Sequence, residues 1–174
     1  GYKSFRKGQE EIVKSILGKK NTLGVMPTGG GKSICYQIPA IIKKGTTIVI
    51  SPLISLMKDQ VNELNSSGIS ATTINSSMGN KEISDELRKI RDNKIKLLYV
   101  SPERLLLDSF IELANSIVVP FLIIDEAHCI SQWGHDFRKS YLDINTFIEK
   151  MEKKPIIGAF TATATEKVME DIKN

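Results

Sequence analysis

The segment that decides the fold is Met26-Pro27-Thr28-Gly29-Gly30-Gly31-Lys32-Ser33, which stands between an apolar run of strand length and a stretch with helical spacing. Three successive glycines let the backbone turn its N–H groups inward, and the N-terminus of the following helix adds positive potential, which suits phosphate oxygens. In this pattern Lys32 neutralises the β- and γ-phosphates and Ser33 offers a hydroxyl to magnesium. We predict a nucleotide-binding P-loop, in which Met26 replaces the usual first glycine, formed by Thr28, Gly29, Gly30, Gly31, Lys32 and Ser33.

Apolar runs of strand length alternate along the chain with segments of helical period. The clearest helix follows Pro52 and stops before Gly68, and another is expected over residues 165–174. A run that is apolar at every position is typical of a strand buried on both faces of a parallel sheet, which binds ligands at the carboxyl ends of its strands. We therefore predict an α/β fold with a mainly parallel sheet, whose strands occupy residues 22–26, 46–50, 71–74, 96–100, 120–124 and 155–160.

Two adjacent carboxylates, Asp125 and Glu126, directly follow the apolar run at 120–124. At such a strand end one carboxylate can hold the hydrated magnesium that Ser33 also contacts, and its neighbour can orient and deprotonate the attacking water. We predict that Asp125 serves the metal and that Glu126 is the base. Adjacent acids at a strand end are also common in solvated turns and helix caps, and the P-loop upstream favours the catalytic interpretation.

The composition of the 174 residues, with 41% apolar, 25% charged and 6% aromatic, is that of one domain with a sizeable core. It excludes a disordered chain and a disulfide-stapled miniprotein. Cys35 and Cys129 have no paired spacing and no basic-then-apolar leader precedes the P-loop, which indicates a reducing, intracellular compartment: the bacterial cytoplasm with its nucleoid, or the eukaryotic nucleus. No apolar run approaches the roughly 20 residues of a membrane span, so we expect no membrane partner.

The net charge of +4 is uneven, because residues 1–20 contain six basic and two acidic residues while the rest carries equal numbers of each. A nucleic-acid footprint is normally a patch spread over the binding face. The charge therefore does not by itself predict nucleic-acid binding, and that prediction depends on motifs.

Taken together, the P-loop, the Asp125–His128 box and Thr161-Ala162-Thr163-Ala164 resemble the N-terminal motor domain of a superfamily-two helicase. The segment from Cys129 to Arg138 is similar to the aromatic-rich loop of the RecQ family, which other helicases with the same box lack. The resemblance implies a RecA-like three-layer α/β/α sandwich over residues 1–174, the first of two motor domains with ATP between them. It also implies that His128 takes part in catalysis and that Thr161 and Thr163 couple ATP hydrolysis to DNA contact.

The N-terminus resembles the RecQ adenine-recognition element, which implies that Tyr2 and Arg6 flank the base and Gln9 binds its edge. Two segments after strands resemble motifs Ia and Ib on the DNA-facing side, with the residues Ser51, Pro52, Ser55, Lys58, Ser101 and Arg104. Taken alone, Ser-Pro after a strand is an ordinary turn and cap signal. The occurrence of two such segments favours the functional interpretation.

Trp133 and Phe137 lie four residues apart and could both be core residues of a helix. Gly134 and the polar neighbours of Trp133 make a poor buried face, whereas an exposed aromatic among polar donors suits stacking on single-stranded bases. We predict a nucleic-acid-binding loop formed by Gln132, Trp133, His135, Phe137 and Arg138. A zinc site built from Cys35, His128, Cys129 and His135 is not favoured, because their spacing is not that of metal ligands.

The sequence and its resemblance together predict the ATP-binding half of a DNA helicase that uses ATP and Mg²⁺ and unwinds duplexes by 3′ to 5′ translocation on single strands. The expected partners are single-stranded and duplex DNA and a second RecA-like domain of the same protein, which supplies arginine fingers. Two alternatives stay open. One is a DEAH-box translocase acting on RNA, and the other is a nucleotide-gated binding module without productive turnover.

Overall fold

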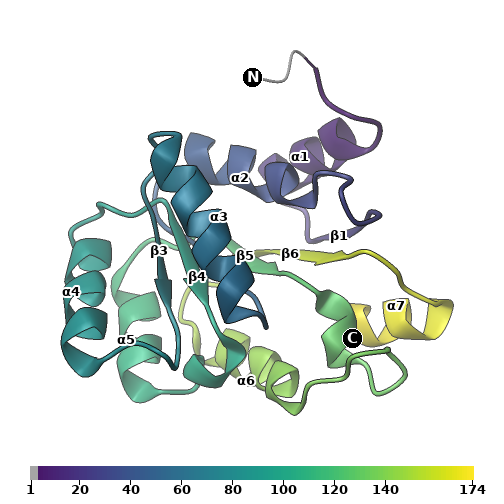
Figure 1. The fold of residues 1–174 in the computed structure, drawn as a ribbon. Helices are drawn as coiled ribbons and strands as arrows, with labels where there is room; N and C mark the ends of the chain where they lie inside the picture. Colours follow the sequence, from purple (N-terminus) through teal and green to yellow (C-terminus); the bar gives the residue numbers. More distant parts are fainter. Residues whose placement is uncertain (1–3) are drawn as a thin grey trace.

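Six short apolar segments form the strands of one sheet, and every strand begins and ends within one residue of its predicted bounds. The computed structural model describes residues 4–174, so the adenine-element residue Tyr2 lies outside the described residues. The sheet order is β1-β6-β5-β2-β4-β3, and all neighbouring strands pair in parallel (Figure 1). The strands are β1 Thr22–Val25, β2 Thr47–Ile50, β3 Ala71–Ile74, β4 Leu97–Val100, β5 Phe121–Ile124 and β6 Ile156–Thr161.

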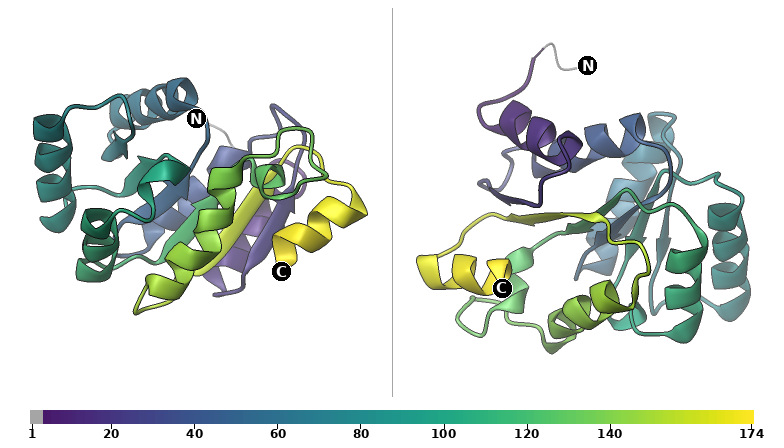
Figure 2. Two further views of the ribbon diagram at one scale, coloured as in Figure 1. Left: turned by 90° about the horizontal axis from the view of Figure 1, so that it is seen from below. Right: turned by 180° about the vertical axis from the view of Figure 1, so that it is seen from behind.

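Helices cover both faces of this sheet and complete the predicted three layers (Figures 1 and 2). On one face lie α1 Gln9–Leu17, α2 Lys32–Ile42 and α3 Ile54–Ser66. On the other lie α4 Asn80–Arg91, α5 Asp108–Ser116 and α6 Asp143–Lys150. Three short 3₁₀ segments, η1 Pro102–Arg104, η2 Ala127–Ile130 and η3 Lys139–Leu142, follow strands β4 and β5, and the chain ends in α7 Glu166–Lys173.

The core is divided in two by the sheet, as the period of two along a strand requires. In β2, Ile48 and Ile50 belong to the cluster under α4 to α6, whereas Val49 belongs to the cluster under α1 to α3. All three side chains have no exposed surface. The unbroken apolar pattern of the central strands is therefore explained by burial on both faces.

The strand order brings the chemically important segments to one edge of the sheet. β6 lies between β1 and β5, with Val25 opposite Thr161 and Ile124 opposite Ala159. The P-loop after β1, the acidic box after β5 and Thr161 at the end of β6 are therefore neighbours at the carboxyl ends of adjacent strands. Within residues 4–174, none of the helices has the length and apolar character that crossing a membrane requires.

Candidate active site

The glycine loop takes backbone conformations that only glycine adopts easily. Gly29 and Gly31 have φ angles of 77° and 79°, in the left-handed region. A Cβ on Gly31 would also collide with the amide nitrogen of Gln9, and one on Gly30 would lie 2.8 Å from the Pro27 carbonyl oxygen. Met26 lies outside the left-handed region and its N–H bonds to the Thr161 oxygen at 3.0 Å, so this position needs no glycine.

Arg6 and Gln9 brace the glycine loop from the N-terminal side. Gln9 is buried, and its Nε2 donates to the oxygens of Gly31 at 3.1 Å and Gly30 at 3.4 Å. Its Oε1 accepts the N–H of Arg6 at 2.7 Å, while the Arg6 guanidinium donates to the Gly29 oxygen at 2.7 Å. Both side chains line the cavity described next, and their predicted role in binding the adenine base stays a prediction.

A cavity of about 790 Å³ opens over the P-loop at the carboxyl edge of the sheet. It is large enough for a nucleotide. The cavity brings together the predicted phosphate, metal and base residues, since its lining includes Arg6, Gln9, Thr28, Gly29, Gly31, Lys32, Ser33, Asp125 and Glu126. Parts of α2 and α3 form another wall, through Tyr36, Gln37 and Gln60.

Asp125 is held at the end of β5 by its backbone. Its N–H donates to the Ile50 oxygen at 2.9 Å, and the buried Tyr141 hydroxyl donates to its carbonyl oxygen at 2.7 Å. Burial, followed by the neighbouring Glu126 carboxylate, raises the pKa of Asp125 to about 6, against the lowering effect of the Glu126 N–H and Lys32. A cation beside this carboxylate would favour its ionised form. The Asp125 carboxylate and the Ser33 hydroxyl both line the cavity, and together they offer the oxygen ligands that magnesium prefers.

Glu126 has an unusual backbone for a residue that carries a side chain. Its φ of 49° and ψ of 46° place it in the left-handed region, at the point where the chain turns from β5 into η2. Strain of this kind typically costs on the order of 1 kcal/mol or more and is concentrated at functional sites. The turn places its carboxylate in the wall of the cavity, where the predicted base has to lie.

His128 connects the acidic box to the end of β6. Its Nδ1 lies 2.8 Å from the Thr161 hydroxyl oxygen, and that hydroxyl donates to the Thr163 oxygen at 3.0 Å. Since the Thr161 hydroxyl directs its own proton at the Thr163 oxygen, it accepts a hydrogen bond from His128, whose Nδ1 is therefore protonated. The Glu126 Oε2 lies 3.4 Å from the same nitrogen. Burial is the main cause that lowers the pKa of His128, which favours the neutral ring.

The aromatic segment is an exposed loop, and the alternative of a core helix is wrong. Trp133 is 66% exposed and Phe137 38% exposed. Gly134 packs so tightly that an added Cβ would lie 2.5 Å from the His128 oxygen. The His135 ring stacks on that of His128 with centroids 4.2 Å apart, which joins the loop directly to the acidic box. Gln132 is exposed, and Arg138 bonds to Asp136 and to the Pro52 oxygen at 3.4 Å.

Two of the predicted nucleic-acid-binding residues, the serines after β2 and β4, are buried. Ser51 and Ser101 are 2% and 3% exposed, and their predicted contact with nucleic acid stays a prediction. They are buried because each serine continues the sheet: Ser51 donates its N–H to the Val100 oxygen at 3.1 Å, and Ser101 to the Ile74 oxygen at 3.4 Å.

The other predicted residues of these two segments lie nearer to the surface. Ser55 and Lys58 are exposed on α3, and Pro52 is half-buried. Arg104 is half-buried and donates to the Asn75 oxygen at 3.2 Å. Lys58 therefore keeps a cationic group available near the carboxyl edge, and its predicted contact with nucleic acid stays a prediction.

The four potential zinc ligands do not converge. Cys35 lies in α2, in the helix layer on the other face from Cys129. A different set, His128, Cys129 and Asp136, places ligand atoms within 4.8 Å of one another. Burial raises the pKa of the Cys129 thiol to about 12, and Asp136 is paired with Arg138 at 3.2 Å. Because these groups are protonated or already paired, we assign no metal to this set.

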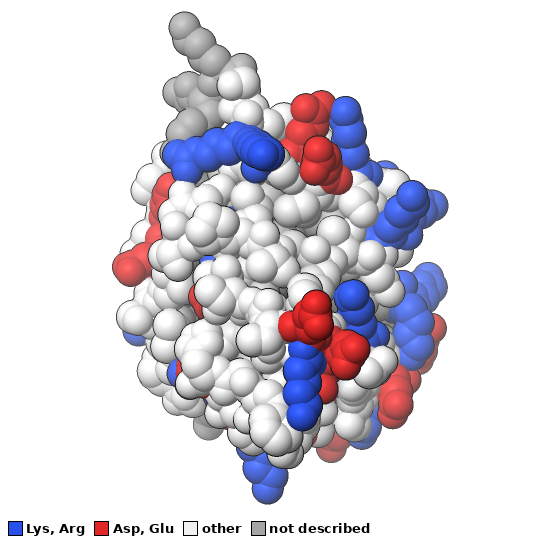
Figure 3. Space-filling model, turned by 90° about the vertical axis from the view of Figure 1, so that its right-hand side faces the viewer, with Lys and Arg blue, Asp and Glu red and all other residues white. Residues whose placement is uncertain are grey.

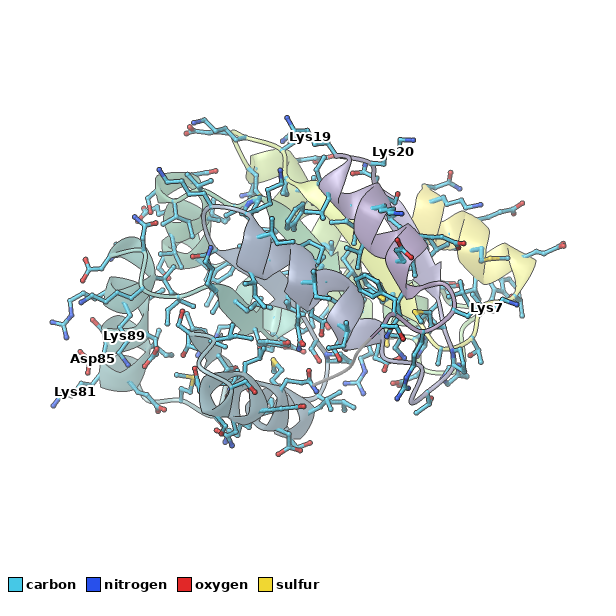
Figure 4. The ribbon with its side chains drawn as sticks, turned by 90° about the horizontal axis from the view of Figure 1, so that it is seen from above. Lys7, Lys19, Lys20, Lys81, Asp85 and Lys89 are labelled. Carbon is cyan, nitrogen blue, oxygen red and sulfur yellow. The ribbon has the colours of Figure 1, made fainter. Side chains whose placement is uncertain are left out.

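Charged side chains do not form one basic face on the view of Figure 3, where both signs are mixed. The basic residues Lys7, Lys19 and Lys20 project outward around α1, whereas Lys81, Asp85 and Lys89 lie on α4 at the opposite end of the molecule (Figure 4). The excess of basic residues in the N-terminal part of the sequence therefore lies around α1, and it does not form a basic patch at the aromatic loop.

The sequence is similar to those of known helicases. The sequence matches the DEAD/DEAH box helicase family over residues 6–172. It is 54% identical over 173 residues to the ATP-dependent DNA helicase RecQ of Bacillus subtilis (strain 168), covering 99% of this chain and 29% of that protein. It is 50% identical over 172 residues to the ATP-dependent DNA helicase RecQ of Haemophilus influenzae, covering 99% of this chain and 28% of that protein.

Solved structures support the fold. A hypothetical ATP-dependent RNA helicase from Sulfolobus tokodaii matches with a TM-score of 0.76 at 22% identity, covering 99% of this chain and 50% of that one. The Hef helicase domain of Pyrococcus furiosus matches with a TM-score of 0.67 at 21% identity, covering 97% and 36%. The chain thus spans less than a third of the length of the two RecQ relatives. It belongs to the DEAD/DEAH box helicase family, and its resemblance to RecQ helicases is confirmed.

Proposed function

We propose that this chain is the ATP-binding motor domain of a DNA helicase that unwinds duplexes by 3′ to 5′ translocation on single strands. The observation that carries the proposal is the continuous path from the cavity to the aromatic loop. Glu126 lies beside His128, His128 bonds to Thr161, and His135 stacks on the His128 ring. An exposed Trp133 a few residues away is suited to stack on single-stranded bases.

In this site, bound ATP supplies the phosphoanhydride bond and Mg²⁺ supplies the charge that steadies its phosphates. The loop N–H groups and the Lys32 ammonium would bind the phosphate oxygens, and Ser33 and Asp125 would hold the metal. Glu126 orients a water at the open side of the cavity and accepts its proton. The Nδ1 of His128 bonds to the Thr161 hydroxyl and lies 3.4 Å from the Glu126 Oε2, while the His128 ring stacks on His135. We propose that DNA bound to the aromatic loop acts on the Glu126 carboxylate through these contacts.

A second RecA-like domain of the same protein is part of this proposal, since the relatives are longer than the matched region. Arginine fingers from that domain stabilise charge in the transition state and are worth about 10³- to 10⁵-fold in rate. The 174-residue chain alone is therefore expected to bind ATP with Mg²⁺ and to hydrolyse it very slowly. We also propose an intracellular location, at the bacterial nucleoid or in the eukaryotic nucleus.

The decisive experiment measures ATP hydrolysis by the intact protein with single-stranded DNA, single-stranded RNA or no polymer. It also measures strand separation on duplexes with a 3′ or a 5′ single-stranded tail. We expect stimulation by DNA and unwinding of the 3′-tailed duplex. Stimulation by RNA alone would establish the RNA translocase instead. Nucleic-acid binding that depends on ATP but proceeds without turnover would establish the binding module.

A further inference from the structure

The C-terminal helix α7 packs against η2, beside the aromatic loop (Figure 2). None of the motifs in the sequence includes this helix. Together with the loop it borders a hollow of about 310 Å³, lined by His128, Trp133, Gly134, His135, Thr163, Ala164, Thr165 and Val168. The helix therefore touches the same region that connects the aromatic loop to the acidic box.

Asp171 of α7 reaches the loop through Ser131. The Ser131 hydroxyl, whose residue is 1% exposed, donates to the Asp171 carboxylate and accepts the backbone N–H of Trp133 at 3.1 Å. The single hydroxyl proton points at the Asp171 carboxylate, so the lone pairs of the oxygen are directed elsewhere and one of them accepts the Trp133 N–H. The carboxylate thus fixes the direction of the bond that holds the backbone of Trp133.

Lys167, one helical turn before Asp171, contacts the Trp133 side chain. Its Nζ lies 3.5 Å from the centroid of the indole ring, which is within the range of a cation–π interaction. The indole is otherwise largely exposed. Two residues on one side of α7 therefore act on Trp133, one through its backbone and one through its ring.

We propose that α7 positions the aromatic loop, with Asp171 as the positioning residue acting through Ser131 and Lys167 steadying the indole ring. This inference rests on the proposed function, in which Trp133 stacks on single-stranded DNA. A loop held in one geometry binds a base without first being ordered, because the entropy cost of ordering is already met in the free protein. Loss of Asp171 should leave the cavity intact and weaken the link between DNA and hydrolysis.

The test compares Asp171→Ala, Ser131→Ala and the double variant in the intact protein. Glu170→Ala, which removes an exposed carboxylate from the same helix, is the matched control. Both single variants should reduce the stimulation of hydrolysis by single-stranded DNA about tenfold, the usual size for loss of a charged hydrogen bond, with basal hydrolysis unchanged. The double variant should be no worse than Ser131→Ala, because both changes break the same connection.

Fluorescence gives a readout that is independent of activity, since Trp133 is the one tryptophan of this chain. In the 174-residue chain, Asp171→Ala should lower the anisotropy of the tryptophan emission and increase its quenching by acrylamide, while Glu170→Ala should change neither. Asp171→Asn keeps the volume and an acceptor, so it should give an intermediate result and serves where the alanine variant folds poorly.

The outcomes separate the two hypotheses. If DNA does not stimulate the unmodified protein, the proposed function fails, whereas the fluorescence result still tests the position of the loop. Unchanged anisotropy in Asp171→Ala would overturn the positioning role. So would a lower melting temperature combined with full stimulation per folded molecule, because that result would make the contact merely structural.

Discussion

The nucleotide cavity and the aromatic loop lie side by side but are built in opposite ways. The P-loop side of the cavity is shaped by backbone, with glycines in conformations that other residues resist and with Arg6 and Gln9 holding the loop through hydrogen bonds to its carbonyl oxygens. The aromatic loop exposes its functional side chain and is held by a few contacts of single side chains. The proposed binding of the nucleotide would thus depend on the fold, whereas the proposed coupling to nucleic acid would depend on individual contacts.

This difference predicts that the largest effects come from the cavity. Glu126→Gln in the intact protein should reduce ATP hydrolysis about 10²- to 10⁴-fold, because a base acts chiefly in the transition state. The substitution keeps the side-chain shape and the left-handed backbone, so ATP affinity should stay near normal. Turnover assays and calorimetric titration with ATP measure the two quantities. Loss of ATP binding in Glu126→Gln would contradict the assigned role.

Lys32→Ala, in the same cavity, should instead weaken the binding of ATP. In the proposed mechanism its ammonium binds the phosphates already in the ground state, so the affinity for ATP should fall about tenfold or more, as expected for a lost charge-assisted contact. The same titration measures it. Normal ATP affinity in Lys32→Ala would show that the backbone of the loop alone is sufficient for binding.

The sequence predicted the cavity better than the segments after β2 and β4, for physical reasons. A parallel strand buried on both faces leaves an unbroken apolar run, and the P-loop and Asp125 follow such runs directly, so their meeting at one edge could be predicted. The burial of Ser51 and Ser101 could not, since nothing in a Ser-Pro pair shows whether the sheet continues through the serine. Their N–H bonds to neighbouring strands decide that point.

The contacts that hold the aromatic loop could not be predicted from the sequence, for a different reason. Ser131 and Asp171 lie 40 residues apart, and only the packing of α7 against η2 brings them together. In the sequence, the C-terminal helix showed a spacing of apolar residues, which predicts a helix and says nothing of its polar side. Tyr141, which holds the carbonyl of Asp125, likewise had no motif to mark it. Long-range hydrogen bonds of single polar residues leave no local pattern.

On the loop, Trp133→Ala in the intact protein should reduce stimulation by single-stranded DNA about tenfold, the usual effect of losing one stacked base, and leave basal hydrolysis unchanged. Because the indole is 66% exposed, the free energy of unfolding should change by less than about 1 kcal/mol. Hydrolysis assays and thermal denaturation test this, with the exposed Leu142→Ala as control. A destabilisation of about 3 to 5 kcal/mol would instead mark Trp133 as a core residue.

The last prediction concerns stability and not activity, and it uses the pH dependence of the cavity itself. Because the folded chain raises the pKa of Asp125 from 3.8 to about 6, the folded state binds this proton more tightly than the unfolded state does. The contribution to stability is therefore complete below about pH 4 and is lost as the pH rises through about 6. Asp125→Asn removes that loss, so relative to the unmodified chain it should gain up to about 3 kcal/mol as the pH rises between these values, which denaturant titration at each pH can measure. With Mg²⁺ and ATP present the difference should shrink, because a cation favours the ionised carboxylate. If the difference in the free energy of unfolding between the two proteins did not depend on pH, Asp125 would already be ionised in the free cavity. The carboxylate would then be solvated, as the side chains of the aromatic loop are, in spite of its burial.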